Sequence, residues 1–310
     1  MALLINFFFG KPEDWKAFFD KEMPDLDVRF WPEAGNRDEV DVIACGWLPE
    51  GEFKTFKNLK LIVSLLAGPD HLLHDPAVPT HVPIVRAGNP EGDQMMTETT
   101  LLHVLRHHRN LPAYAAAQAR AEWLNLPRVP AMERKIGVMG LGLIGLAAAK
   151  ALAGIGFQVA GWVRNPRAPI DGIEVFAGRG QLDAFLKRSE IVVNLLPLTT
   201  ELENILDARA FALMPKGGAI VNLGRGGHVV EKDLMAALDS EHLAAATLDV
   251  FRKEPLPGDD PLWKHPKITI MPHASRRVEI KPMMPRVAHA IRCLRAGKPL
   301  ENEIDRKLGY

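Results

Sequence analysis

The chain has 310 residues, with 38 basic and 38 acidic side chains and 47% hydrophobic residues, which is enough for two compact domains with cores of their own. A formal charge of zero provides no field that would attract a polyanion, which argues against nucleic acid or an anionic membrane as the main partner. The expected partner is a small molecule.

The first apolar run of the chain, residues 3–9, predicts a buried strand. It lacks the basic flank and the small-residue cleavage site of a signal peptide, and no run approaches the roughly 20 apolar residues of a membrane span. The only cysteines, Cys45 and Cys293, have no metal-ligand spacing and need neither a disulfide nor zinc. We therefore expect a cytoplasmic protein without membrane attachment.

Short apolar runs alternate with amphipathic segments through the first part of the chain. These patterns predict one helix at residues 13–21 and strands at residues 3–9, 40–44, 61–66 and 84–86. Such alternation is typical of a parallel sheet with crossover helices. A long helix is predicted at residues 97–120, and the proline-bearing stretch 127–130 indicates a boundary.

A second series of apolar runs begins after that boundary. Six strands are predicted at residues 135–139, 158–162, 191–195, 219–223, 244–250 and 268–271. Strands separated by helical segments in this order indicate a doubly wound parallel sheet. The tail at residues 278–295 is helical enough to pack back on the first domain. The predicted fold is therefore α/β, with a substrate domain of residues 1–97 plus 277–310 and a Rossmann dinucleotide-binding domain of residues 98–276.

A glycine-rich turn follows the strand predicted at residues 135–139. Gly140, Gly142 and Gly145 form the pattern G-x-G-x-x-G between that strand and a helix-forming run. The first glycine permits the tight turn, the second lets a pyrophosphate approach the backbone, and the third lets the helix pack on the strand. The helix N-terminus presents free N–H groups to phosphates. This context predicts a dinucleotide site; a turn used only for packing is the alternative.

The end of the next strand indicates which dinucleotide fits. NAD sites usually place an acidic side chain there for the ribose hydroxyls, where it would repel a 2′-phosphate. The sequence instead has Val163, followed by Arg164 and Arg167. Guanidinium groups make charge-assisted hydrogen bonds to a phosphate. We therefore predict that NADPH is preferred over NADH; the alternative is that both arginines are ordinary surface residues.

Three later strand ends carry residues suited to the reduction of a 2-oxo acid. Arg225, Glu254 and His273 each follow a predicted strand, and ligands bind at the carboxyl ends of the strands in a doubly wound sheet. Arg225 can hold a carboxylate and polarise the neighbouring carbonyl. Protonated His273 can supply a proton as hydride reaches the carbon, while Glu254 orients the imidazole and favours its charged form.

These segments resemble a known family. The chain resembles the D-isomer-specific 2-hydroxyacid dehydrogenases, and within them the glyoxylate/hydroxypyruvate reductase A branch. The resemblance is carried by the motif GLGLIG at residues 140–145, the run DVFRKEPLP at residues 249–257 and the order of the three catalytic segments. The similarity covers nearly the whole chain, including the closing residues 304–310. It implies a flavodoxin-like first domain, a cleft that closes between domains, a homodimer, and NADPH-dependent reduction of glyoxylate, hydroxypyruvate or a similar small 2-oxo acid.

The resemblance also implies roles for individual residues. Arg225, Glu254 and His273 take the substrate-binding, histidine-tuning and acid/base roles, and Asp249 would hold the nicotinamide carboxamide. Substrate contacts are implied at Trp47 and, through backbone N–H groups, at Ala67 and Gly68. Further cofactor contacts are expected at Leu143, Ile144, Leu196, Pro197 and Leu223.

Two positions depart from the family pattern. Val163 replaces the usual aspartate, which supports NADP. Leu202 replaces a threonine common in the family, so one polar contact near the cofactor is expected to be missing.

Some alternatives remain open. His103 and His107 lie four residues apart on the long predicted helix, but Arg106 and Arg109 beside them would repel a cation, so we interpret the histidines as solvated or interface residues and expect no metal. A bulkier 2-oxo acid is an alternative substrate, because pocket shape depends on first-domain residues. A non-catalytic dinucleotide-sensing module is the alternative outside catalysis.

Overall fold

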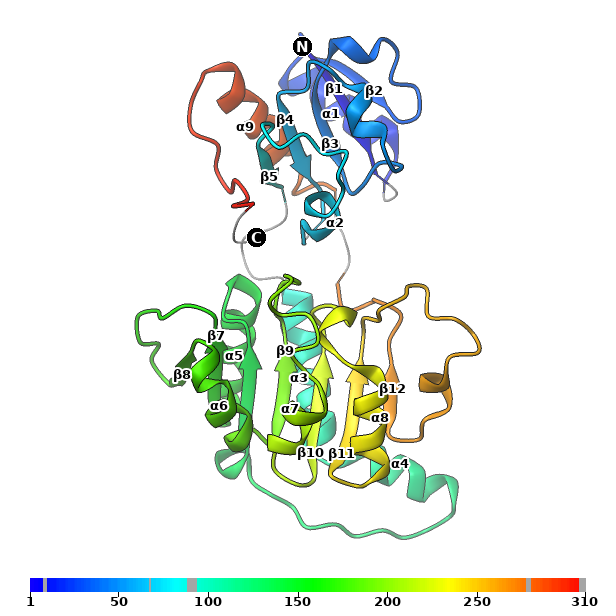
Figure 1. Cartoon of the computed structure of the whole chain (residues 1–310), viewed down its shortest axis with the longest axis vertical. Helices are drawn as coiled ribbons and strands as arrows, with labels where there is room; N and C mark the ends of the chain where they lie inside the picture. Colours follow the sequence, from blue (N-terminus) through cyan, green and yellow to red (C-terminus); the bar gives the residue numbers. More distant parts are fainter. Residues whose placement is uncertain (8–9, 67, 88–93, 277–279, 307–310) are drawn as a thin grey trace. The chain divides into compact units, whose positions relative to one another are not determined.

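The computed structural model of the chain describes residues 1–7, 10–66, 68–87, 94–276 and 280–306 (Figure 1). The chain divides into two compact units, one formed by Met1–Asn89 with Val278–Tyr310 and the other by Pro90–Arg277. Each unit is built on a parallel sheet with helices. The predicted α/β class with two parallel sheets is confirmed.

The sheet of the first unit has five parallel strands in the order β2-β1-β3-β4-β5. Its strands are β1 (Ala2–Asn6), β2 (Asp27–Phe30), β3 (Val40–Cys45), β4 (Leu61–Ser64) and β5 (Ile84–Arg86). Its helices are α1 (Pro12–Glu22), α2 (Asp70–Leu73) and α9 (Met284–Arg295). This strand order is that of flavodoxin-like folds, as the resemblance implied.

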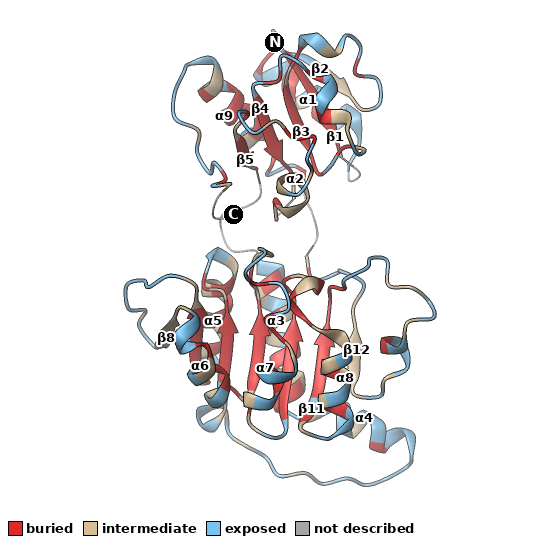
Figure 2. Cartoon of the chain, in the orientation of Figure 1, coloured by how far each residue is buried: buried red, intermediate tan, exposed pale blue. Residues whose placement is uncertain are grey.

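Two helices cover one face of this sheet. Trp15 and Phe19 of α1 and Val287 and Ile291 of α9 are buried against it. Helix α1 begins with Pro12, whose missing N–H and fixed φ suit a first helical turn. The C-terminal helix therefore completes the core of the first unit, and Figure 2 shows the buried strands beneath exposed outer helix surfaces.

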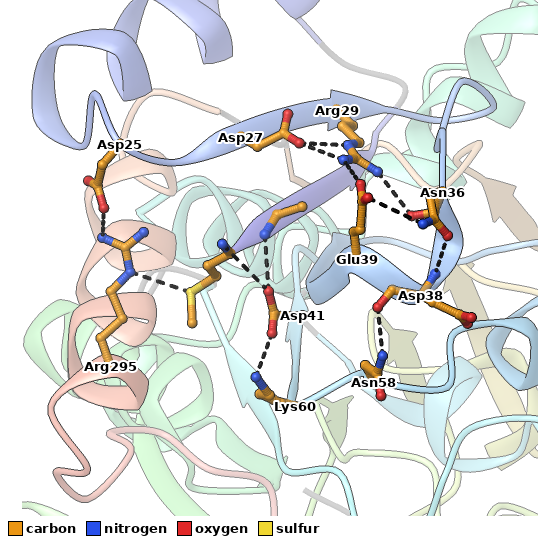
Figure 3. A network of polar contacts seen from close by, with 12 residues as sticks. Asp25, Asp27, Arg29, Asn36, Asp38, Glu39, Asp41, Asn58, Lys60 and Arg295 are labelled. Carbon is orange, nitrogen blue, oxygen red and sulfur yellow. Dashed lines mark hydrogen bonds and ion pairs between the residues drawn. The ribbon is translucent and has the colours of Figure 1, made fainter.

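Strand β2 lies at the edge of the sheet and is held by a polar network (Figure 3). The Arg29 guanidinium donates to the carboxylates of Asp27 and Glu39 and to the carbonyl oxygens of Ala34 and Asn36. These bonds fix the segment between β2 and β3. This strand is partly exposed and carries charged residues. It therefore has no apolar run from which the sequence could predict it.

The sheet of the second unit has seven parallel strands in the order β12-β11-β10-β9-β6-β7-β8. They are β6 (Lys135–Met139), β7 (Gln158–Val163), β8 (Ile173–Ala177), β9 (Ile191–Asn194), β10 (Gly218–Asn222), β11 (Leu243–Leu248) and β12 (Ile268–Ile270). The strand order reverses between β6 and β9, which is the point where a doubly wound sheet binds its ligand. The predicted Rossmann topology is confirmed; the additional strand, β8, is a partly exposed edge strand.

Helices cover both faces of this sheet (Figure 1). One face carries α3 (Gln94–His108) and α5 (Leu143–Ile155), and the other carries α6 (Leu182–Arg188), α7 (Ala208–Leu213) and α8 (Glu231–Asp239). The single long helix predicted at residues 97–120 is wrong. The structure has α3 and a separate helix α4 (Leu111–Ala119), because Asn110 adopts a left-handed conformation with φ of 57° between them.

Within the described part of the chain, no helix combines the length and the apolar character that a membrane crossing requires.

Candidate active site

The glycine turn between β6 and α5 has the geometry of a phosphate-binding turn. Gly140 has φ of +91° and donates its N–H to the Trp162 carbonyl at 2.9 Å. A Cβ atom on Gly145 would lie 1.8 Å from the Gly140 carbonyl oxygen, so no side chain fits there. Gly142 caps the N-terminus of α5, and a Cβ atom on it would meet nothing within 4 Å. Free helix N–H groups facing open space fit a pyrophosphate.

The segment after β7 brings a cation to this turn. The Arg167 guanidinium donates a 2.6 Å hydrogen bond to the Leu141 carbonyl, which lies between the first two glycines. Arg164 is half-buried just after Val163, the last residue of β7. Two arginines therefore follow β7 at the strand end where a Rossmann fold for NAD carries an acidic residue, and Arg167 contacts the glycine turn.

His273 and Glu254 form a direct pair. The imidazole Nδ1 lies 2.7 Å from Glu254 Oε2, and Glu254 Oε1 accepts the Phe251 N–H at 2.8 Å. Because the carboxylate is an acceptor, Nδ1 carries the proton in this pair, and Nε2 points away from it. The side chains are 53% and 34% exposed, so the pair is accessible to a small molecule.

Asp249 holds the backbone of His273. Its carbonyl accepts the His273 N–H at 2.9 Å, and its two carboxylate oxygens accept the N–H groups of Ala274 at 2.7 Å and Ser275 at 3.2 Å. His273 has φ of +51°, an unfavourable left-handed conformation for a residue with a side chain. The buried Asp249 thus stabilises the turn that presents the imidazole.

The loop that carries Arg225 packs against the loop that carries Glu254. A Cβ atom on Gly226 would lie 1.9 Å from the Phe251 carbonyl carbon, so the two backbones touch. The Arg225 guanidinium donates to the Gly224 carbonyl at 2.8 Å. Arg225, Glu254 and His273 therefore follow three neighbouring strands, β10, β11 and β12, whose loops contact one another.

Comparison with known proteins decides the family. Residues 101–275 match the family described as D-isomer specific 2-hydroxyacid dehydrogenase, NAD binding domain. The chain belongs to this family. A relative from Serratia proteamaculans named Glyoxylate/hydroxypyruvate reductase A is 36% identical over 308 residues, covering 97% of both chains. A relative of the same name from Klebsiella pneumoniae is 34% identical and covers 96% of both chains. The predicted family and branch are confirmed.

Solved structures of D-isomer specific 2-hydroxyacid dehydrogenases have the same fold. One from Xanthobacter autotrophicus, in complex with NADPH and MES, is 39% identical with a TM-score of 0.92 and covers 100% of this chain and 99% of its own. An NADPH-dependent glyoxylate/hydroxypyruvate reductase from Sinorhizobium meliloti, in complex with NADP and sulfate, is 33% identical with a TM-score of 0.89 and covers 100% of both chains. This dehydrogenase is therefore an NAD(P)-dependent oxidoreductase, as predicted.

The remaining site residues predicted for the dehydrogenase lie at strand ends of both units. In the second unit, Leu143 and Ile144 begin α5, Leu196 and Pro197 follow β9, and Leu223 follows β10. In the first unit, Trp47 follows β3, is an exposed residue, and accepts a 2.6 Å hydrogen bond from Asn6 on its carbonyl. Gly68 follows β4, and Ala67 lies outside the described residues. The roles of all these residues stay predictions.

Leu202 is buried among the apolar side chains that α6, α7 and α8 pack against the sheet. The leucine that stands here in place of the family threonine is thus part of the core of the dehydrogenase.

Of the two alternatives predicted for His103 and His107, solvated or interface residues, the solvated one is wrong. They are 4% and 8% exposed, because α3 packs them against the sheet. His107 Nε2 lies 2.9 Å from Thr247 Oγ1. Among the described residues, no three His, Cys, Asp or Glu side chains gather in a metal-binding arrangement.

Sequence reasoning missed a buried polar cluster formed by Asn194, Asn222 and His228. The only signal for it was the asparagine that ends each of the apolar runs IVVN and AIVN.

Proposed function

We propose that this dehydrogenase reduces glyoxylate, hydroxypyruvate or a similarly short 2-oxo acid, with NADPH as the preferred reductant. The observation that carries the proposal is the 2.7 Å His273–Glu254 pair beside the Arg225 loop, in the unit that also holds the glycine turn. The names of the relatives from Serratia and Klebsiella support the substrates. The NADPH and NADP complexes of the related structures support the cofactor.

The proposed mechanism divides the work among three side chains. The Arg225 guanidinium binds the substrate carboxylate and polarises the adjacent carbonyl. Glu254 holds the proton on His273 Nδ1, so that Nε2 of the imidazolium faces the substrate and protonates the carbonyl oxygen. When bound, the reduced nicotinamide supplies the hydride. The product is then the corresponding 2-hydroxy acid.

The proposed cofactor site uses the glycine turn and the arginines after β7. The N-terminus of α5 would bind the pyrophosphate, and Arg164 and Arg167 would bind the 2′-phosphate. Val163 leaves no carboxylate at the end of β7 to repel that phosphate. Asp249 is proposed to accept from the nicotinamide carboxamide, since carboxylate oxygens have lone pairs beyond those used by two backbone N–H groups.

The test is oxidation of NADPH and NADH with a panel of glyoxylate, hydroxypyruvate, pyruvate and bulkier 2-oxo acids. We expect the highest kcat/KM with NADPH and a two-carbon or three-carbon acid. Replacement of Arg164 by serine should raise the KM for NADPH about tenfold to a hundredfold, because a charge-assisted hydrogen bond contributes about 1.5 to 3 kcal/mol. The KM for NADH should change little. Preference of the wild type for NADH would contradict the cofactor proposal, and preference for a bulky acid would contradict the substrate.

We also propose that the dehydrogenase is a homodimer in the cytoplasm. The segment of residues 111–132, which begins with α4, exposes large apolar side chains, among them Leu111, Trp123 and Met132. Trp123 is 100% exposed. Large exposed apolar side chains support a protein interface, and a second copy of the chain is the proposed partner. Both cysteines are free and buried, which supports a reducing compartment.

A further inference from the structure

A buried polar cluster lies beneath the Arg225 loop. Asn194 and Asn222 are the last residues of β9 and β10, and the two strands pair them directly. His228 ends the short 3₁₀ turn Gly226–His228 that follows Arg225. All three residues are 0% exposed, so every polar atom in the cluster depends on protein partners.

Backbone groups fix the direction of each hydrogen bond in the cluster. Asn222 Oδ1 accepts the Gly224 N–H at 3.3 Å, and Asn194 Oδ1 accepts the Leu196 N–H at 3.2 Å. The Asn194 amide NH₂ group must therefore donate, to Asn222 Oδ1 at 2.8 Å and to His228 Nδ1 at 2.9 Å. A backbone N–H cannot accept, so flipping either amide would break these bonds.

This arrangement dictates the tautomer of His228. Nδ1 accepts from Asn194 and carries no proton, so the proton is on Nε2, which lies 3.2 Å from the Pro197 carbonyl oxygen and donates to it. An imidazolium would place an N–H against the Asn194 NH₂ group and break the cluster. His228 is therefore neutral in the folded protein.

The cluster joins the two loops that the proposed function needs. It binds Leu196 and Pro197 after β9 on one side. On the other side, Asn222 Nδ2 donates to the Arg225 carbonyl at 3.1 Å. We propose that His228, as the neutral Nε2–H tautomer, is a positioning residue that fixes the Arg225 backbone, and through it the guanidinium that binds the substrate carboxylate. This inference rests on the proposed function of Arg225.

The first experiment replaces His228 by phenylalanine, which keeps a ring but neither bonds Asn194 nor donates to Pro197. We expect the KM for the 2-oxo acid to rise about tenfold to a hundredfold, with a smaller change in kcat, because misplacing Arg225 weakens carboxylate binding. Replacement by glutamine supplies one acceptor and one donor and should recover most of the affinity lost. The matched control is His242→Phe, since His242 bonds the carbonyls of Phe211 and Met214 away from Arg225. It should leave the KM unchanged.

A double-mutant cycle with Arg225→Lys separates positioning from general destabilisation. If His228 acts through Arg225, the His228→Phe effect on KM should fall below about threefold when it is measured in the Arg225→Lys variant. Equal effects in the wild type and in that variant would overturn the inference, as would a wild-type KM in His228→Phe.

A measurement without turnover covers the case in which His228→Phe does not fold. In ¹⁵N NMR of the wild-type protein, the His228 ring should show a protonated Nε2 and a bare Nδ1 throughout about pH 5 to 8, where an ordinary histidine titrates. A ring that titrates in this range, or one protonated on Nδ1, would overturn the inference. Wild type that shows this tautomer but reduces no acid of the panel would refute the proposed function alone.

Discussion

The His273 residue combines an unfavourable backbone conformation with a fully directed side chain. Its N–H and the next two N–H groups all bond to Asp249, which holds the left-handed turn, and Glu254 holds its ring. Strain of this kind persists only where the surroundings enforce it, and it is common at active sites. Backbone and ring are thus positioned by two separate acidic residues.

Replacing Glu254 by glutamine tests the contact between Glu254 and the His273 ring. Glutamine has one acceptor for two donors, the Phe251 N–H and the His273 Nδ1–H, and it carries no charge to stabilise an imidazolium. We expect kcat for the 2-oxo acid to fall about a hundredfold to a thousandfold, within the range of general acid catalysis. The matched control is Glu231→Gln, because Glu231 accepts from the backbone of the same loop, at Arg252, outside the His273 pair. A kcat within twofold of wild type for Glu254→Gln would contradict the role of Glu254.

The sequence was sufficient to predict Arg225, Glu254 and His273 as candidates because each lies in the loop that follows an apolar strand, and parallel strands end on one edge. It was insufficient for His228, because no periodicity or motif marks that residue. Its partner Asn194 lies 34 positions away, and Asn222, which bonds Asn194, lies 6 positions away. The three meet only through the register of β9 and β10 and the fold of the loop after β10. Contacts of this kind depend on tertiary structure.

At the scale of elements, helix α3 buries histidines against the sheet of the second unit. His107 contacts Thr247 of β11, and burial lowers the pKa of His107 to about 4, with the charges of His103 and Arg106 acting in the same direction. Burial also lowers the pKa of His103, which the Asp249 carboxylate partly opposes. The helix therefore needs neutral histidines to pack on the sheet.

This burial predicts acid sensitivity of the second unit. The unfolded chain binds a proton at His107 with an ordinary pKa near 6.5, whereas the folded chain does so only near 4. The stabilisation is thus complete above about pH 6.5 and is lost as the pH falls towards 4, by about 1.4 kcal/mol per pH unit and about 3 kcal/mol in total. His107→Gln should flatten the free energy of unfolding over this range, measured by urea denaturation at a series of pH values.

Thr247→Val is the matched control for this prediction. It removes the hydroxyl that contacts His107 while leaving the imidazole to titrate. We expect lower stability at neutral pH, by about 1 kcal/mol, with the acid slope retained. If His107→Gln keeps the wild-type slope, the buried imidazole is not the group responsible.

The elements that sequence patterns missed share a physical reason. Strands β2 and β8 lie at sheet edges and are partly exposed, so neither has the continuous apolar run that identified the central strands. The break between α3 and α4 occurs at Asn110, a residue that tolerates a left-handed conformation but does not require it. Sequence patterns report burial, and they are weakest where burial is partial.

At the scale of the whole molecule, the two sheets have related but different strand orders. The first unit follows the flavodoxin-like order and the second the Rossmann order, and each has its own switch point, between β1 and β3 and between β6 and β9. The second of these holds the glycine turn. Because α9 packs on the first sheet, the chain passes through the second unit and returns to complete the first.

The proposed homodimer is the remaining property at this scale, and Trp123 offers a direct test of it. A fully exposed tryptophan in a segment rich in apolar side chains would cost solubility in a monomer, and tryptophan is among the residues that contribute most at interfaces. Sedimentation velocity should show a wild-type dimer, and Trp123→Ser should raise the dimer dissociation constant about thirtyfold or more, which corresponds to about 2 kcal/mol or more.

Trp263→Ser is the control for the dimer test, because Trp263 is also exposed but lies on the 3₁₀ turn Pro261–Lys264, where its Nε1–H donates to the Pro257 carbonyl. This variant should sediment as the wild type does. A wild-type monomer at all concentrations would refute the dimer itself, whereas equal dissociation constants for wild type and Trp123→Ser would move the interface to another face. Since Trp123 lies outside the glycine turn and the Arg225, Glu254 and His273 loops, loss of the dimer with kcat unchanged would further show that each subunit is catalytically complete.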